Sequence, residues 1–210
     1  MKHQTATPQH SAFEEMQRAA LARLDGKQPE EIAARTGLTY DRRRQCFTFA
    51  SLGQDVEIHY PGYTIQPILD EWHQLLLYHY MDMADGTPLS GQLIAFGELP
   101  GGMVRGGGFD RQSEEALSLR LGRSARETVE QACRGLGGVL TASNADVCAV
   151  FSLLPRYPIT MKLWLADEEL PGSGRLLLDQ SAGHYLSVED AVTAGSLLLE
   201  ALLRKIEVTE

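Results

Sequence analysis

The stretch of residues 64–102 constrains the fold most, because it predicts a long buried helix that ends abruptly in a tight turn. Pro67 suits the first helical position, where its missing N–H group would have no partner anyway. We therefore expect a central core helix over residues 67–83, ended by the turn at residues 85–88, where Gly86 accepts a positive φ. Large apolar side chains recur along it at helical spacing and form a broad stripe: Ile68, Trp72, Leu75, Leu76 and Met83.

His79 falls on the same stripe, four residues after Leu75. A buried histidine can act as a ligand, in particular to a metal, or carry a proton. It can equally be a core residue whose ring nitrogen has one hydrogen-bond partner, as buried polar groups usually do. Both interpretations stay open, whereas Trp72 and Trp164 are both expected in the core because of their large apolar rings.

A short strand is expected over residues 93–99, followed by a glycine-dense segment over residues 101–108 that carries Arg105. Backbone without Cβ atoms can approach an anion closely, so Arg105 is a candidate ligand-binding residue. The segment is not a P-loop, because no Lys-Ser or Lys-Thr pair follows it. We expect a flexible surface loop here.

The N-terminal part combines helical and strand patterns. Residues 1–10 are expected to be a loose start, and residues 11–44 a helical segment whose second half resembles the beginning of a helix-turn-helix. Two alternating stretches, 45–51 and 55–60, instead predict a β-hairpin after it, in which Glu57 and His59 face away from the apolar side chains.

The remaining patterns predict further helices and strands in close succession. Consecutive strands with short connections favour antiparallel pairing, and hence an α+β fold. We expect a single α+β domain over residues 11–210, with a mainly antiparallel sheet packed by the central helix and the C-terminal helix. The expected helices are 109–120, 124–134 and 187–205, and the expected strands are 147–154, 159–166 and 175–179.

Charge and composition exclude several function classes. The net charge of −9 and the pI near 5.2 argue against a nucleic-acid partner, in spite of the Arg42-Arg43-Arg44 run. No apolar run approaches the roughly 18 residues of a membrane span, and the first ten residues lack the apolar core of a signal peptide. We therefore expect a cytoplasmic protein with no membrane partner.

The three cysteines, Cys46, Cys133 and Cys148, are scattered and form no CxxC pair. A metal site made of cysteines alone is therefore not expected within one chain. A Gly-x-Ser-x-Gly elbow and a His-Glu-x-x-His motif are also missing from the sequence, so no catalytic residue is assigned and enzyme activity is left open.

The acidic loop 167–169 is the best polar cluster, because neighbouring carboxylates repel one another and favour a cation or a basic partner. If the loops converge, they could form an oxygen- and nitrogen-ligated site for Mg²⁺, Mn²⁺ or Fe²⁺. The alternative is an exposed hairpin turn next to a helix-capping region. The candidate metal ligands are Asp167, Glu169, Asp179 and His184.

Arg156 lies between two prolines, Pro155 and Pro158. Its guanidinium could hold a carboxylate or phosphate group of a ligand. It could equally pair with Glu168 or Glu169 across the hairpin.

Several of these segments resemble a bacterial and archaeal family, domain of unknown function 3786. The resemblance covers about residues 15–205 and is carried by LLLYHYMDMADGTPLSGQLIAFGELPGG, GLGG, LLPRYPITMKLWLADEELPGSGRLLLDQSA and SVEDAVTAGSLLLEALL, with ARTGLTYDRRRQCFTFASLGQDVEIHYPG before them. Members of this family are common in anaerobes, and some carry a cysteine-rich iron–sulfur segment like that of corrinoid proteins. This chain lacks that segment, so no iron–sulfur cluster is expected from it.

The resemblance implies a cytosolic small-ligand-binding or accessory protein, linked to anaerobic metalloenzyme or corrinoid metabolism. Its partner would be an unknown small molecule or a partner protein, and a homodimer is possible. The alternative is a metal-dependent enzyme that uses loop 167–169 with Asp179 and His184. A DNA-binding regulator acting through residues 28–44 is the third and most distant hypothesis.

Overall fold

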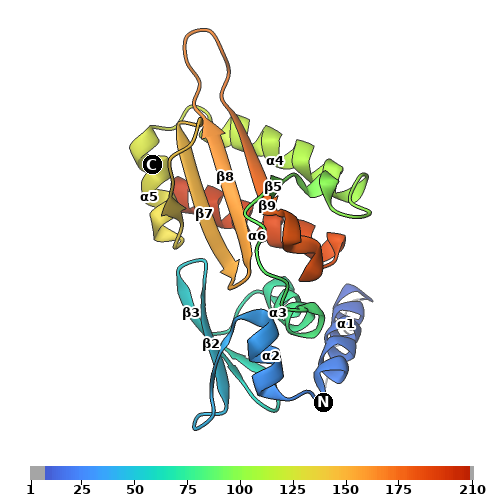
Figure 1. The fold of residues 1–210 in the computed structure, drawn as a ribbon. Coiled ribbons are helices and arrows are strands. Elements are labelled where there is room, and N and C mark those ends of the chain that lie inside the picture. Colours follow the sequence, from blue (N-terminus) through green and yellow to red (C-terminus); the bar gives the residue numbers. More distant parts are fainter. Residues whose placement is uncertain (1–7, 209–210) are drawn as a thin grey trace, which may run out of the picture.

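The computed structural model describes residues 8–208, which fold into two antiparallel sheets with helices packed against them (Figure 1). This confirms the α+β class, although the strands form two sheets where we expected one. Residues 1–7 of the expected loose start lie outside the described residues. Residues 8–10 already belong to the first helix, α1 (Pro8–Leu24).

The N-terminal half contains a four-stranded sheet with the order β1-β2-β3-β4. Each strand pairs with the one that follows it in the chain, and the predicted hairpin is confirmed. Helices α1, α2 and α3 lie beside this sheet (Figure 1). The elements are α2 (Pro29–Thr36), β1 (Thr39–Asp41), β2 (Cys46–Ser51), β3 (Gln54–His59), β4 (Thr64–Gln66) and α3 (Glu71–Met83).

The C-terminal half contains a five-stranded sheet with the order β5-β9-β8-β7-β6. Helix α6 crosses behind its central strands, with α4 and α5 to either side (Figure 1). The elements are β5 (Leu93–Ile94), η1 (Phe96–Glu98), α4 (Arg105–Leu121), α5 (Arg126–Gly135), β6 (Val139–Leu140), β7 (Val147–Leu154), β8 (Tyr157–Trp164), β9 (Ser173–Asp179), η2 (Gln180–His184) and α6 (Val188–Glu207).

The central helix begins later than Pro67 suggests. Pro67 follows strand β4, and helix α3 starts at Glu71 because the Asp70 carboxylate accepts a hydrogen bond from the Trp72 N–H (2.9 Å). The middle of the predicted stripe, including Leu75 and Leu76, is buried as expected. Its ends are not: Trp72 is 50% exposed, so its predicted place in the core was wrong.

The glycine-dense segment is not a flexible loop. Gly106 belongs to the first turn of α4, which packs tightly on η1. A Cβ atom on Gly106 would lie 2.2 Å from the carbonyl oxygen of Phe96, so only glycine fits there. The expected strand over residues 93–99 is correspondingly short, because the chain enters η1 after Ile94.

Buried hydrogen bonds join the two halves. The Ser51 hydroxyl on β2 donates to the carbonyl oxygen of Leu153 on β7 (2.7 Å) and lies 3.0 Å from His73 Nε2. Because Ser51 has one hydrogen, His73 must donate the second bond. The Tyr80 hydroxyl likewise donates to the carbonyl oxygen of Thr36 (2.5 Å) and accepts from the Arg156 N–H (3.0 Å). The apolar core is continuous across this junction.

The described residues include no helix with the length and apolar character needed to cross a membrane. The arginine run at residues 42–44 pairs in part with acidic groups, since Arg42 lies 2.8 Å from Glu30 and Arg44 2.6 Å from Glu57. Strand β1 follows α2, so the second helix of a helix-turn-helix is not formed there.

Candidate ligand-binding cleft

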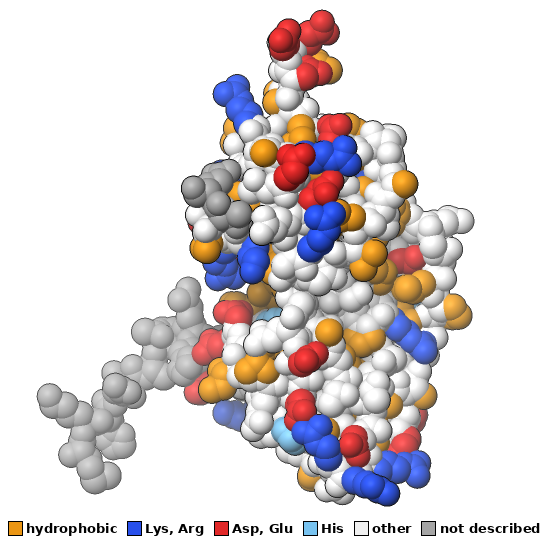
Figure 2. Space-filling view, turned by 90° about the vertical axis from the view of Figure 1, so that its left-hand side faces the viewer, with side chains coloured by type: hydrophobic (Ala, Val, Ile, Leu, Met, Phe, Trp, Pro, Cys, Tyr) orange, Lys and Arg blue, Asp and Glu red, His pale blue; other side chains and the backbone are white. Residues whose placement is uncertain are grey.

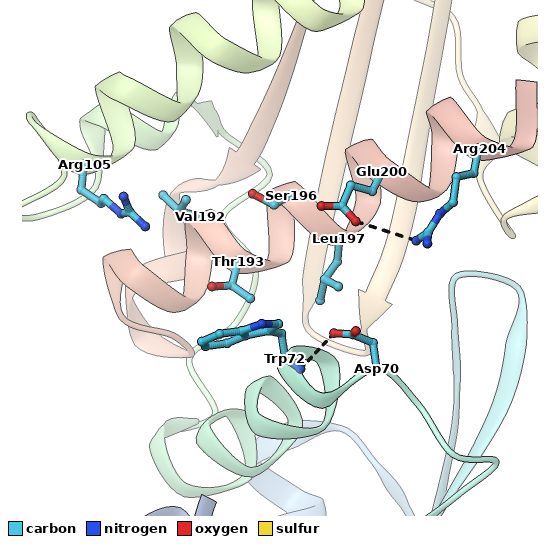
Figure 3. Close-up of a pocket in the computed structure, with 9 residues that line it drawn as sticks. All are labelled: Asp70, Trp72, Arg105, Val192, Thr193, Ser196, Leu197, Glu200 and Arg204. Atoms are coloured by element: carbon cyan, nitrogen blue, oxygen red, sulfur yellow. Dashed lines mark hydrogen bonds and ion pairs between the residues drawn. The ribbon is translucent and has the colours of Figure 1, made fainter. Parts of the chain in front are cut away.

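A cleft of about 380 Å³ lies between α3 and α6, at the junction of the two halves (Figure 3). The N-terminal end of α4 closes one side of it. Its lining mixes aromatic, aliphatic, hydroxyl and charged side chains: Asp70, Trp72, Arg105, Val192, Thr193, Ser196, Leu197, Glu200 and Arg204.

Trp72 forms the α3 side of the cleft. Its position follows from the helix start, because the Asp70 cap fixes the first turn of α3 and the indole leaves that turn toward α6 (Figure 3). Phe13 on α1 packs edge-to-face against the ring, with 5.5 Å between the ring centroids. One part of the indole is thus held by the protein, while half of its surface faces solvent in the cleft.

Charged groups line the cleft, and their availability differs. Asp70 is engaged as the cap of α3, and Glu200 lies 3.9 Å from Arg204 on the same helix. Arg105 at the start of α4 reaches toward Val192 (Figure 3) and has no ion pair with any described residue. Arg105 is therefore the cation in the cleft that can meet a ligand anion without breaking an existing pair.

His79 lies near this cleft without lining it. Its Nδ1 atom is 2.7 Å from Asp190 Oδ1, so the pair ties α3 to α6. Ser187 donates to the other carboxylate oxygen and also caps α6. Burial raises the pKa of Asp190, but the hydrogen bonds from His79 and Ser187 outweigh this effect and leave the pKa below its ordinary value. The contact holds the two walls of the cleft together.

Arg156 lies in the β7–β8 turn, where its Nη1 atom donates to the carbonyl oxygen of Gly86 (3.0 Å). Its stem packs against Gly37, whose hypothetical Cβ would lie 3.2 Å from Arg156 Nε. The expected pairing with Glu168 or Glu169 is not formed. The reason is topological, since these acidic residues follow β8 and lie at the opposite end of that strand.

The four candidate metal ligands do not converge. Asp167 and Glu169 precede β9, whereas Asp179 is its last residue and His184 follows it, so the strand separates the two pairs by about 20 Å at its ordinary rise per residue. Figure 2 shows the acidic side chains of the β8–β9 loop at the tip of a protrusion, far out in solvent. Asp167 accepts hydrogen bonds from the Glu169 and Leu170 N–H groups, which makes it a turn-forming residue.

Asp179 is buried, 5% exposed, and its carboxylate accepts several hydrogen bonds from the protein. It accepts hydrogen bonds from the N–H and hydroxyl groups of Ser90 and Ser181 and from the Gly91 N–H, at 2.6–3.0 Å. Burial raises its pKa, but these hydrogen bonds outweigh burial and lower the pKa to about 2. The residue therefore fastens the loop of residues 90–91 to the end of β9.

His184 lines a second hollow, of about 540 Å³, between η2 and the loop of residues 87–100. Its Nδ1 atom lies 2.8 Å from Asp85. Hydrogen bonds from Thr87 and His184 lower the pKa of Asp85 to about 2. This pair joins the chain after α3 to η2.

The sequence analysis identified Arg105 as a candidate ligand-binding residue, but it did not identify Trp72, which forms the aromatic side of the cleft. Trp72 was assigned to the core because its spacing fits the apolar stripe. Its place in the first turn of the helix, next to a capping aspartate, was the available signal that its ring could lie at the edge of the core. The lining residues of α6 carry no such signal, since their role depends on how α6 packs over α3.

A comparison with known proteins gives a family and no activity. No curated protein and no solved structure matches the chain. A family model described as "Domain of unknown function" matches residues 28–201 of the 210 residues, which includes both sheets and both walls of the cleft. The chain belongs to this family, DUF3786, as its sequence suggested.

Proposed function

We propose that this protein binds a small ligand with a planar ring and an anionic group, in the cleft between α3 and α6. The observation that carries this proposal is the half-exposed indole of Trp72 facing a hollow that also contains Arg105, an arginine without an ion pair to any described residue. The proposal describes a binding protein, and it assigns no catalytic residue.

The physical argument starts from the aromatic ring. An indole is a large apolar group with a flat face, and stacking with a planar ring adds to the free energy gained by covering it. Phe13 fixes the orientation of Trp72, so little conformational entropy is lost when a ligand stacks on it. The volume of about 380 Å³ lies within the range of pockets that hold small molecules.

The polar groups favour an anionic substituent on that ring. Arg105 offers a planar set of N–H donors suited to carboxylate or phosphate oxygens. The hydroxyl groups of Thr193 and Ser196 on α6 also line the cleft, with Thr193 next to the indole (Figure 3), and they can donate to or accept from a ligand. Apolar contact would come from Val192 and Leu197.

Fluorescence titration with anilinonaphthalene sulfonate, which has a planar aromatic system and one anion, tests this site. We expect Trp72→Ala to weaken binding about tenfold, because a stacked aromatic contact is lost. Arg105→Gln should weaken sulfonate binding while leaving the neutral analogue phenylnaphthylamine unaffected.

Matched controls come from the same chain. Arg111→Gln changes an exposed arginine of α4 outside the cleft, and Trp164→Phe changes the other tryptophan. Both should bind the probe as the wild type does. If Trp72→Ala and Arg105→Gln bind the probe with the same affinity as these controls, the cleft is excluded as its binding site.

The wider role that we propose, an accessory protein of anaerobic metalloenzyme or corrinoid metabolism in the cytoplasm, rests on the family resemblance. Titration with hydroxocobalamin tests its corrinoid part. A change in the visible spectrum that saturates with the protein supports it, and a spectrum unchanged by the protein contradicts it.

A further inference from the structure

The outer face of the four-stranded sheet carries a cluster of three potential metal ligands. Cys46 on β2 lies directly opposite His59 on β3 in the antiparallel register, and Glu57 precedes His59 by two residues. Directly opposed residues, and residues two apart on one strand, point to the same face of a sheet. Cys46, Glu57 and His59 therefore share the face opposite the buried side chains of Phe47 and Ile58.

The donor atoms of these residues are close enough to share an ion. One sulfur, one ring nitrogen and one carboxylate oxygen lie within 4.8 Å of one another. Donor atoms around one tetrahedral zinc ion lie about 3.3–3.8 Å apart, as zinc bond lengths require. The cluster is thus wider than the bound arrangement by about 1.5 Å at most, a difference that side-chain rotation can close.

A separate observation concerns the nitrogen of His59. The Nε2 atom is buried and has no hydrogen-bond partner among the described residues. Its nearest carboxylate oxygen, Glu57 Oε2, lies 3.6 Å away, which is too long for a hydrogen bond. A buried nitrogen without a partner costs free energy, and a bound ion would recover it.

We propose that Cys46, Glu57 and His59 bind a divalent ion of the zinc type. Thiolate and imidazole ligands suit zinc well, and a carboxylate oxygen is an accepted third ligand. A magnesium or calcium ion would instead prefer oxygen ligands alone. This site goes beyond the proposed function, since it lies on the outer face of a sheet and shares no residue with the cleft.

Arg44 holds one of the three ligands, Glu57, without being a ligand itself. Its Nη2 atom donates to both carboxylate oxygens of Glu57, at 2.7 and 2.6 Å. Each oxygen keeps a further lone pair, so Glu57 can accept from the arginine and bind the ion at once. Metal-binding carboxylates are commonly held by such a second partner, which orients them.

The three ligands differ in exposure, which sets what the site can do. The Cys46 side chain is fully buried, whereas His59 and Glu57 are 34% and 31% exposed. The side chains of His59 and Glu57 therefore border on solvent, whereas the coordinating Nε2 atom of His59 is itself buried. Three protein ligands leave a fourth tetrahedral position open for water or for a group of a ligand.

Cobalt titration of the chelator-treated full chain tests the site, because cobalt replaces zinc and its bond to a thiolate gives a charge-transfer absorption band. We expect one equivalent of cobalt to produce this band and zinc to displace it. Cys46→Ser should abolish the band. Cys148→Ser, which changes another buried cysteine on a strand, should keep it.

A second variant keeps the test decisive if Cys46→Ser fails to fold. His59→Gln changes a partly exposed side chain, and it should weaken zinc binding more than about 100-fold in competition with a chromophoric chelator. His184→Gln is the matched control and should bind zinc as the wild type does. A wild type without the cobalt band, or a His59→Gln variant with unchanged zinc affinity, would overturn the proposal.

Discussion

Two polar clusters at the two sheets differ in how completely their groups are paired. Asp179, at the end of β9, accepts five hydrogen bonds from Ser90, Gly91 and Ser181 and is nearly inaccessible to solvent. His59, on the outer face of the N-terminal sheet, has a buried nitrogen without a partner among the described residues. The first cluster is held by several hydrogen bonds within the protein, and the second has one ring nitrogen without a partner among the described residues.

This difference separates structural from binding roles on physical grounds. The Asp179 carboxylate stabilises the fold, because its removal leaves the buried donors of Ser181 and the donors of the loop of residues 90–91 without this partner. An unsatisfied nitrogen contributes little to the fold and gains most when something binds to it. We therefore expect substitutions at Asp179 to change stability without changing metal binding, and substitutions at His59 to do the reverse.

The largest effect is expected for Asp179→Ala. Loss of the carboxylate leaves the N–H and hydroxyl groups of Ser90 and Ser181 unpaired and detaches the loop of residues 90–91, at a cost of about 2–4 kcal/mol. Urea unfolding measures this value. Asp167→Ala is the control, since that aspartate forms an exposed turn, and it should cost less than about 1 kcal/mol. A similar loss in both variants would refute the distinction between the hydrogen-bonded cluster around Asp179 and an ordinary turn.

A somewhat smaller effect is expected from acid. The pKa of Asp179 is lowered from 3.8 to about 2, so the folded state binds the proton less readily than the unfolded chain. Its contribution to stability is therefore complete above about pH 5 and is lost as the pH falls through 2. The lowering corresponds to about 2 kcal/mol.

The matched variant for this pH effect is Asp179→Asn, which has no charge to lose. The difference in the free energy of unfolding between wild type and variant should shrink by about 2 kcal/mol from pH 5 to pH 2. Other carboxylates with lowered pKa values, such as Asp85, titrate in both proteins and cancel in this difference. A difference that does not depend on pH would show that the hydrogen bonds do not favour the charged form.

The smallest effect on stability is expected for His59→Ala in metal-free protein. The side chain is partly exposed and its Nε2 atom makes no hydrogen bond, so we expect a change of less than about 0.5 kcal/mol in thermal or urea unfolding. Zinc should then raise the melting temperature of the wild type and leave that of the variant unchanged. A loss above about 2 kcal/mol without metal would instead make His59 a structural residue.

The two sheets also differ in how much of them the sequence could predict. The hairpin β2–β3 was expected with nearly correct bounds, because period-two alternation and a short turn act over a few residues. The outward direction of Glu57 and His59 followed from the same alternation. The position of Cys46 opposite His59 did not, because it requires the register of the hairpin.

The C-terminal sheet depends on contacts that local patterns do not encode. Strand β5 pairs with β9, so Leu93 lies opposite Asp179 across many intervening residues. Only this pairing shows that the Asp179 carboxylate accepts hydrogen bonds from the loop of residues 90–91 and holds it in place. Likewise, the glycines of α4 indicate a close approach to η1, and the sequence alone could not distinguish this from a flexible loop.

Local sequence patterns suffice to predict the α+β class, the antiparallel hairpins, the buried middle of α3 and the cap of α6 at Ser187. These features arise from side-chain periodicity and from hydrogen bonds between residues a few positions apart. The packing of distant segments, in contrast, is needed to show that Trp72 faces a cleft, that Arg105 and α6 complete it, and that the four candidate metal ligands do not converge on one site. Such outcomes depend on packing between distant segments, because the direction of a side chain is set by whichever element comes to lie against it.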